Sequence, residues 1–113
     1  MIETGTVLTN ARPAALRLYR SLIAALQRVG PLREELKKTS VHLMRGSAFA
    51  GVQLRREYLI VTIKSERPIV SPRVTKGDQV SKNRWHNEVR ISNEADLDHE
   101  LLAWLRTAYE LCA

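Results

Sequence analysis

The sequence predicts an α+β domain in which an antiparallel sheet carries two helices on one face, one helix from each end of the chain. Apolar residues recur every three or four positions near both ends and every second position between them, and short polar connections separate the alternating segments. The chain has 113 residues, of which 44% are hydrophobic and 27% are charged. Length and composition predict a single globular domain over residues 1–113, with residues 1–10 as a flexible N-terminus.

The first predicted helix covers residues 11–29. Its apolar residues share one face and its arginines occupy the others, as expected for a helix that packs on a sheet. Asn10 is a candidate cap, and Pro13 falls in the first turn, where its missing N–H costs little. Gly30 and Pro31 are expected to end the helix, the glycine in a left-handed conformation and the proline as a helix breaker.

Four segments alternate between apolar and polar residues and are predicted to be strands. They cover residues 39–44, 48–54, 58–64 and 85–91. Short connections between the first three imply antiparallel neighbours. The linker that precedes them, residues 32–38, favours a short helical turn.

The last part of the chain contains a predicted long loop and the second helix. Residues 65–84 break the alternation with prolines, a glycine and scattered polar residues, so they are predicted to form a loop. A short edge segment around Ile69 and Val70 would make the sheet five-stranded. The last helix is predicted over residues 95–111, with Asn93 as its cap and acidic residues in its first turn, where they favour the helix dipole. The order is therefore α-β-β-β-β-α.

One hydrophobic core should join these elements, because each has an apolar face. The predicted core residues are Leu22, Leu26, Val41, Val61, Ile63, Val89, Leu101, Leu105 and Ala108.

Several segments resemble a known family. They are residues 36–43 (LKKTSVHL), 49–52 (FAGV), 85–91 (WHNEVRI), 96–98 (DLD) and 104–109 (WLRTAY). With them the chain resembles an uncharacterised bacterial domain of unknown function, DUF5655, which occurs as small stand-alone proteins and at the C-terminus of proteins described as predicted transport proteins. The resemblance covers nearly the whole chain after Asn10. It implies domain boundaries but no activity, so no catalytic or binding residue is carried over from the family.

Charge supplies the main functional hypothesis. Lysines and arginines number 18 against 12 acidic residues, which gives a formal net charge of +6 and favours a polyanionic partner. Bases gather in and beside the predicted loop, where they face only Glu66 and Asp78. Because a loop can adapt to phosphates, the predicted contacts to nucleic acid or another polyanion are Lys64, Arg67, Arg73, Lys76, Lys82 and Arg84.

A second candidate is the face of the sheet without helices. Alternation sends every second residue of the strand over 85–91 to this face and turns Trp85 the other way, where it is expected to join the core. The candidate ligand face, which suits an anion, consists of His86, Glu88, Arg90 and Thr62, with Lys64 beside them. A cross-strand ion-pair ladder between Glu88 and neighbouring bases is the structural alternative.

Complete catalytic and metal-binding signatures are missing from the sequence. Three histidines lie in different predicted elements without a second ligand at metal-ligand spacing, so neither a metal nor a cofactor is expected. Cys112 belongs to the apolar face of the last helix and is expected to pack rather than to react. We therefore expect a non-enzymatic binding module. A protein-interaction or self-associating module is the alternative, which an exposed apolar patch on the helix-free face would favour, and an enzyme is the third.

Location follows from two further observations. The single cysteine and the lack of a signal-peptide pattern in residues 1–10 predict a cytoplasmic protein. The longest apolar run, at residues 58–61, is far shorter than the roughly 20 residues of a membrane helix, so no membrane partner is expected.

Overall fold

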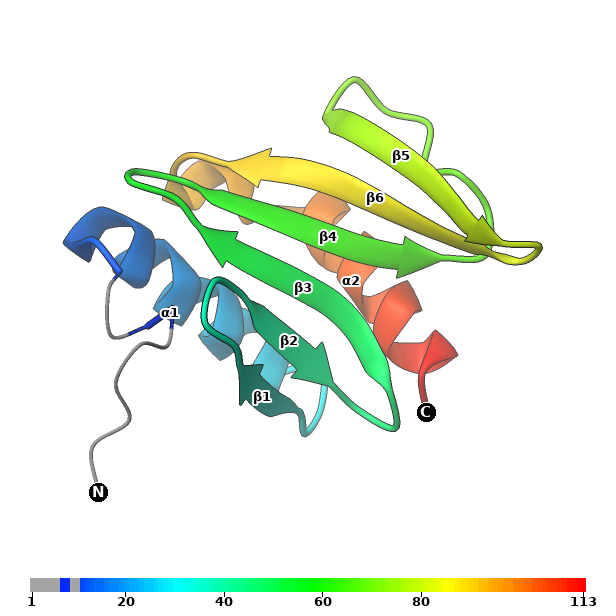
Figure 1. Ribbon diagram of the computed structural model, residues 1–113, viewed down its shortest axis with the longest axis horizontal. Helices are drawn as coiled ribbons and strands as arrows, with labels where there is room; N and C mark the ends of the chain where they lie inside the picture. The colour runs from blue at the N-terminus through cyan, green and yellow to red at the C-terminus, as the bar shows by residue number, and fades with distance from the viewer. Residues whose placement is uncertain (1–6, 9–10) are drawn as a thin grey trace.

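The protein folds as an antiparallel sheet with two α-helices, and the computed structural model describes Val7, Leu8 and residues 11–113 (Figure 1). In chain order the elements are α1 (Pro13–Gln27), β1 (Arg33–Leu36), β2 (Val41–Met44), β3 (Ala48–Leu54), β4 (Leu59–Ser65), β5 (Val74–Ser81), β6 (Arg84–Ile91), the 3-10 turn η1 (Glu94–Asp96) and α2 (His99–Leu111). The strand order is β1-β2-β3-β4-β6-β5. The α+β class is confirmed, but the sheet has six strands rather than the four or five predicted.

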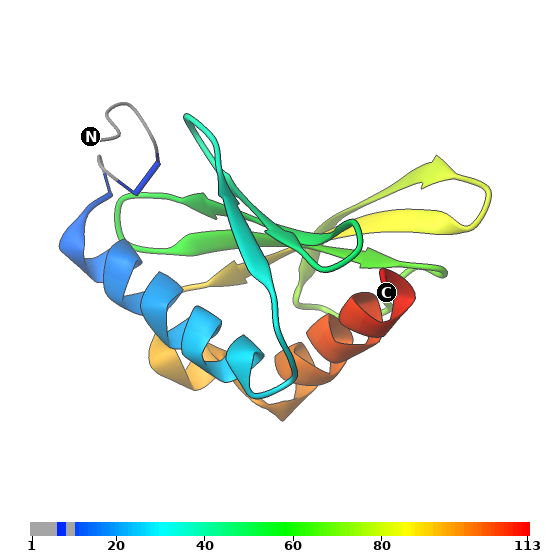
Figure 2. The same ribbon diagram turned by 90° about the horizontal axis from the view of Figure 1, so that it is seen from below.

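Both helices cover the same face of the sheet (Figure 2). Each of the nine predicted core residues is at most 1% exposed, so the predicted apolar faces are confirmed. Cys112 is also buried, as expected for a packing residue. Over Val7, Leu8 and residues 11–113, no helix combines the length and the apolar character that a membrane crossing requires.

β1 occupies the linker for which the sequence favoured a helical turn. The strand pairs with β2, and Leu36 lies opposite Val41. The buried Tyr19 hydroxyl of α1 donates a hydrogen bond to the Glu34 carboxylate. Burial, and then this carboxylate, raises the pKa of Tyr19. Pairing and the contact with α1 therefore override the local helical preference of this charged segment.

Residues 65–84 are not one long loop, because β5 lies within them. Each β5 residue after Val74 is exposed, whereas β6 buries Val89 and Ile91. The strand with the larger apolar content thus lies inside, next to β4, and β5 forms the edge. The predicted edge segment at Ile69 and Val70 is not a strand, and Val70 is 94% exposed.

Gly30, which was predicted to end the first helix in a left-handed conformation, has another role. The helix stops at Gln27, and Gly30 does not adopt a left-handed conformation. A Cβ atom on Gly30 would lie 2.4 Å from the hydroxyl oxygen of Tyr109, and this hydroxyl donates a hydrogen bond of 2.7 Å to the carbonyl oxygen of Pro31. A side chain on Gly30 would therefore displace the Tyr109 ring of α2 from this hydrogen bond.

The start of α2 lies later than predicted. The helix begins at His99, and Asp98 is its cap, with a carboxylate that accepts a hydrogen bond of 3.0 Å from the N–H of Leu101. Asn93, the predicted cap, precedes η1 instead.

At the N-terminus, Val7 is buried and its N–H donates a hydrogen bond of 3.0 Å to the carbonyl oxygen of Lys37, so this part of the predicted flexible segment is packed. Asn10, the predicted cap of the first helix, and residues 1–6 and 9 lie outside the described residues.

Candidate anion-binding site

The helix-free face of the sheet brings together polar side chains from four strands. His42, Gly51 and Thr62 are register partners on β2, β3 and β4. Two residues further along β4, Lys64 lies directly opposite His86 of β6. The predicted placement of Thr62, Lys64 and His86 on one face is therefore correct.

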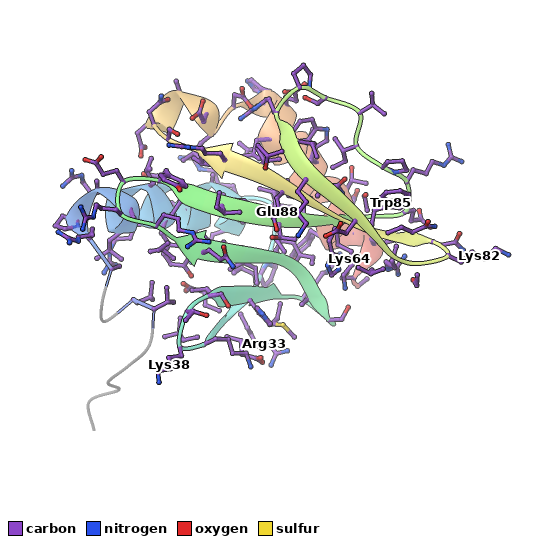
Figure 3. The ribbon with its side chains drawn as sticks, turned by 45° about the horizontal axis from the view of Figure 1, so that its top comes forward. Arg33, Lys38, Lys64, Lys82, Trp85 and Glu88 are labelled. Atoms are coloured by element: carbon purple, nitrogen blue, oxygen red, sulfur yellow. The ribbon has the colours of Figure 1, made fainter. Side chains whose placement is uncertain are left out.

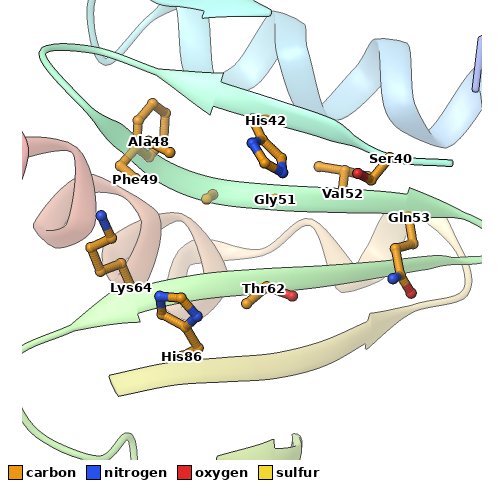
Figure 4. Close-up of a pocket in the computed structure, with 11 residues that line it drawn as sticks. Ser40, His42, Ala48, Phe49, Gly51, Val52, Gln53, Thr62, Lys64 and His86 are labelled. Atoms are coloured by element: carbon orange, nitrogen blue, oxygen red, sulfur yellow. The ribbon is translucent and has the colours of Figure 1, made fainter. Parts of the chain in front are cut away.

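A hollow of about 260 Å³ opens on this face over β3 (Figure 4). His42 stands on one side of β3, and Lys64 and His86 stand together on the other. Among the described residues that line the hollow, none is aspartate or glutamate. The ionisable side chains in its wall are thus all basic, although Asp78 of β5 lies opposite His86 outside the lining. The polar side chains of the lining are Ser40, His42, Gln53, Thr62, Lys64 and His86.

Gly51 forms the floor of the hollow, although neither space nor backbone requires a glycine there. A Cβ atom at this position would lie 3.9 Å from the carbonyl oxygen of Val41 and 4.0 Å from Cβ of Thr62, which are ordinary contacts, and the residue is not left-handed. The missing side chain leaves open space between His42 and Thr62. A glycine inside a strand often marks the close approach of a ligand or of another backbone.

Sequence reasoning did not select His42 or Gly51 as site residues. The signals were present, because His42 alternates with the core residues Val41 and Leu43, and Gly51 interrupts a strand. What was missing was the pairing of β2 with β3, which places these two residues opposite each other.

Glu88 and Arg90 share the helix-free face but do not line the hollow. Within the described part of the chain, no salt bridge contains Glu88, and Lys76 lies 3.5 Å from Asp78 instead. The ion-pair ladder considered for Glu88 is therefore not formed. Arg90 lies toward the other end of the strand, where its Cζ is 3.7 Å from the centroid of the Tyr58 ring.

Arg73, one of the six predicted polyanion contacts, holds the structure together instead. Its guanidinium donates hydrogen bonds to the Asp98 carboxylate, at 2.8 and 3.0 Å, to Glu100 at 3.2 Å and to the carbonyl oxygen of Asp96 at 2.8 Å. Its Cζ lies 5.8 Å from the centroid of the Trp104 ring. These contacts fasten the segment before β5 to the start of α2, so Arg73 is not a free cation for phosphate.

The remaining predicted bases differ in their surroundings. Lys76 has Asp78 as a partner, whereas no salt bridge among the described residues includes the other four, Lys64, Arg67, Lys82 and Arg84. Lys64 and Lys82 lie toward the same end of the sheet, which is also the end of the β5–β6 hairpin (Figure 3). Arg67 follows the end of β4, and Arg84 begins β6. We call these four residues the basic end of the sheet.

Trp85 is half-buried and does not belong to the core, contrary to the prediction. It lies opposite Ser65 and Gln79, in the part of the hairpin that extends past α2 (Figure 2). Trp85 lies on the face of the sheet that the helices cover elsewhere. Because the helices do not reach this part of the sheet, the indole remains partly exposed.

Two other possible sites are less suited to a ligand. A second hollow, of about 380 Å³, is lined by Arg33 and Arg45 among others, but Arg45 donates a 3.0 Å hydrogen bond to the carbonyl oxygen of Tyr109 and its Cζ stacks 4.1 Å from that ring. Over Val7, Leu8 and residues 11–113, no group of three or more histidine, cysteine or acidic side chains is arranged to hold a metal ion.

Comparison with known proteins identifies one family. The family model described as "Domain of unknown function (DUF5655)" matches residues 4–112, nearly the whole chain. Neither the curated proteins nor the solved structures contain a match to this sequence.

Proposed function

This chain belongs to the DUF5655 family of domains of unknown function, and we propose that it is a non-enzymatic binding module for nucleic acid or another polyanion. One observation carries the proposal: Lys64 and His86 lie opposite each other in the wall of a hollow whose described lining contains no carboxylate. Phosphate groups are attracted to such a concave, base-lined surface, where side chains donate hydrogen bonds to their oxygens.

The basic end of the sheet extends this surface. Its lysines and arginines keep their charge available for phosphates, whereas Arg73 and Lys76 have acidic partners. Each phosphate contact releases condensed counterions, so binding through such contacts weakens with salt. With four contacts, log K on duplex DNA should fall with log salt at a slope of about −3 to −4.

The alternative, a protein-interaction or self-associating module, has less support on the helix-free face. A contiguous apolar patch there would favour it, but the centre of this face carries His42, Thr62 and Lys64. Two large apolar residues, Val70 and Val80, are conspicuously exposed, at 94% and 53%, and both lie in the segment that contains the edge strand β5.

A cytoplasmic location is part of the proposal, and the free Cys112 thiol agrees with a reducing compartment.

A salt titration against labelled single- and double-stranded DNA tests the proposal by fluorescence anisotropy. The site variant is Lys64→Gln, Lys82→Gln and Arg84→Gln combined. A control variant, Arg17→Gln, Arg20→Gln and Arg28→Gln combined, removes the same charge from exposed positions on and just after α1, on the opposite side of the sheet. We expect the site variant to lose most of the binding and to have a shallower salt slope, and the control variant to stay close to wild type.

Two results would overturn the proposal. If the wild type binds neither DNA at low salt, the domain is not a nucleic-acid binder. If the control variant loses binding while the site variant keeps it, the phosphates contact α1 instead of the basic end of the sheet.

A further inference from the structure

We infer that the hollow over β3 binds one nucleoside phosphate unit, with the phosphate at Lys64 and His86 and the planar base over Gly51 beside His42. This inference rests on the proposed function and assigns a chemical class to its ligand. The hollow has three parts that correspond to such a molecule, namely a basic side, an open floor and a polar rim.

The basic side of the hollow, Lys64 and His86, is formed by two strands that pair directly. Lys64 and His86 are register partners on β4 and β6, so their side chains emerge on the same face at neighbouring strands, about 5 Å apart along the sheet. An ammonium group and an imidazole N–H both donate hydrogen bonds, and together they suit the oxygens of a single phosphate.

The open floor suits a flat ring. His42 and Thr62 flank Gly51 on the two neighbouring strands, which lie about 10 Å apart, or two strand spacings. Because the strand between them has no side chain at this position, a planar group can lie against the backbone of β3. The imidazole of His42 offers an aromatic surface on which a nucleobase can stack.

The rim supplies the remaining polar groups. Ser40, Gln53 and Thr62 line the hollow with two hydroxyls and one amide, each able to donate and to accept hydrogen bonds. The volume of the hollow, about 260 Å³, lies just below the range of small-molecule sites, roughly 300–1,000 Å³. A hollow of this size suits a nucleotide-sized molecule better than a bare ion.

Glu88 should oppose the bound phosphate. It lies two residues from His86 on the same face, outside the lining of the hollow, and opposite Thr62. The negative charge of Glu88 repels an anion bound at Lys64 and His86. Removal of this charge therefore reports on where the phosphate binds.

The experiment uses adenosine 5′-monophosphate and ribose 5-phosphate as probes, in amide NMR titrations of the full chain. We expect the nucleotide to bind the wild type about tenfold or more tightly than the sugar phosphate, because base stacking adds to the phosphate contacts. Gly51→Val, which fills the floor, should abolish this ratio and leave sugar-phosphate binding in place. Lys64→Gln should weaken both probes, Arg106→Gln on α2 should weaken neither, and Glu88→Gln should tighten both several-fold.

Equal affinity of the wild type for the two probes would overturn the base position, and so would an unchanged ratio in a folded Gly51→Val variant. Weaker binding by Glu88→Gln would overturn the phosphate position. Binding of neither probe would overturn the whole inference, even if DNA binding through the basic end of the sheet persists. Nucleotide binding without DNA binding would support this site and refute a nucleic-acid partner.

Discussion

The two faces of the sheet differ in what limits the size of their side chains. Ala50 and Gly51 are neighbours on β3 and both are small, but Ala50 points toward the helices and is only 7% exposed, whereas Gly51 forms the floor of the hollow on the other face. Ala50 lies beside its register partners Leu43 and Ile63, which are fully buried on the closely packed helix side of the sheet. No described neighbour of Gly51 limits it in this way, since a Cβ atom would make only ordinary contacts.

This difference should separate the side chains that stabilise the fold from those that are free to bind a ligand. On the covered face, each side chain is held by several elements, and a change there should alter the free energy of unfolding. On the helix-free face, side chains mostly contact solvent, so their chemistry can change at little cost to the fold.

The largest effect is expected in the core of the covered face. Leu101→Ala should lower the free energy of unfolding by about 2–5 kcal/mol, because Leu101 is fully buried and its truncation leaves a cavity. Urea denaturation followed by circular dichroism measures the change. A loss below about 1 kcal/mol would mean that α2 does not pack as described.

An amide on each face makes a matched pair. Asn87 is 1% exposed; its side chain donates hydrogen bonds to the carbonyl oxygen of Ile63 at 3.0 Å and to Ser65 at 2.9 Å, and accepts one from the N–H of Ile69 at 3.2 Å. Asn87→Ala should therefore cost about 1–3 kcal/mol in urea denaturation. Gln53→Ala, on the helix-free face, should change stability by less than about 0.5 kcal/mol. Similar losses for both would contradict the separation.

Two basic residues of the segment 65–84 should also differ in their effect on stability. Arg73→Ala removes the hydrogen bonds to Asp98 and Asp96 and should cost about 1 kcal/mol, since the pair is partly exposed and the network extends beyond one contact. Lys82→Ala should have no measurable effect on the thermal midpoint. If Arg73→Ala leaves the midpoint unchanged, the segment before β5 is not fastened to α2 by this residue.

Gly51→Val should keep the wild-type stability or raise it by up to about 1 kcal/mol. Glycine in a strand loses more conformational freedom on folding than other residues, and valine favours extended backbone. Thermal unfolding measures this directly. A clear destabilisation would show that the glycine is needed by the fold, and the hollow would then have a structural explanation.

The smallest effect concerns acid. The N–H of Leu101, and then the Arg73 guanidinium, holds the pKa of Asp98 below its ordinary value. A carboxyl whose pKa is lowered on folding stabilises the protein above its unfolded pKa, and this contribution is lost as the pH falls through the folded pKa. As the pH falls below about 4, the free energy of unfolding of Asp98→Asn, measured by urea denaturation, should therefore decrease less than that of the wild type. Parallel pH profiles would contradict the role of this carboxylate.

The sequence alone determined the two α-helices, four of the strands and the whole predicted core. Their apolar periods are strong because each element buries one face, as with Leu22 on α1 and Val61 on β4. Alternation also placed Thr62, Lys64 and His86 on one face correctly, because side chains of a strand must alternate.

Tertiary structure decided what local pattern does not encode. β1 and β5 carry few apolar residues and become strands through pairing with β2 and β6, which supply the hydrogen bonds. Pairing of β2 with β3 places His42 opposite Gly51, and packing of the segment before β5 on α2 removes Arg73 from the free bases. Each of these outcomes depends on contacts between residues that are far apart in the chain. Such contacts form only when the sheet and its helices assemble around one core.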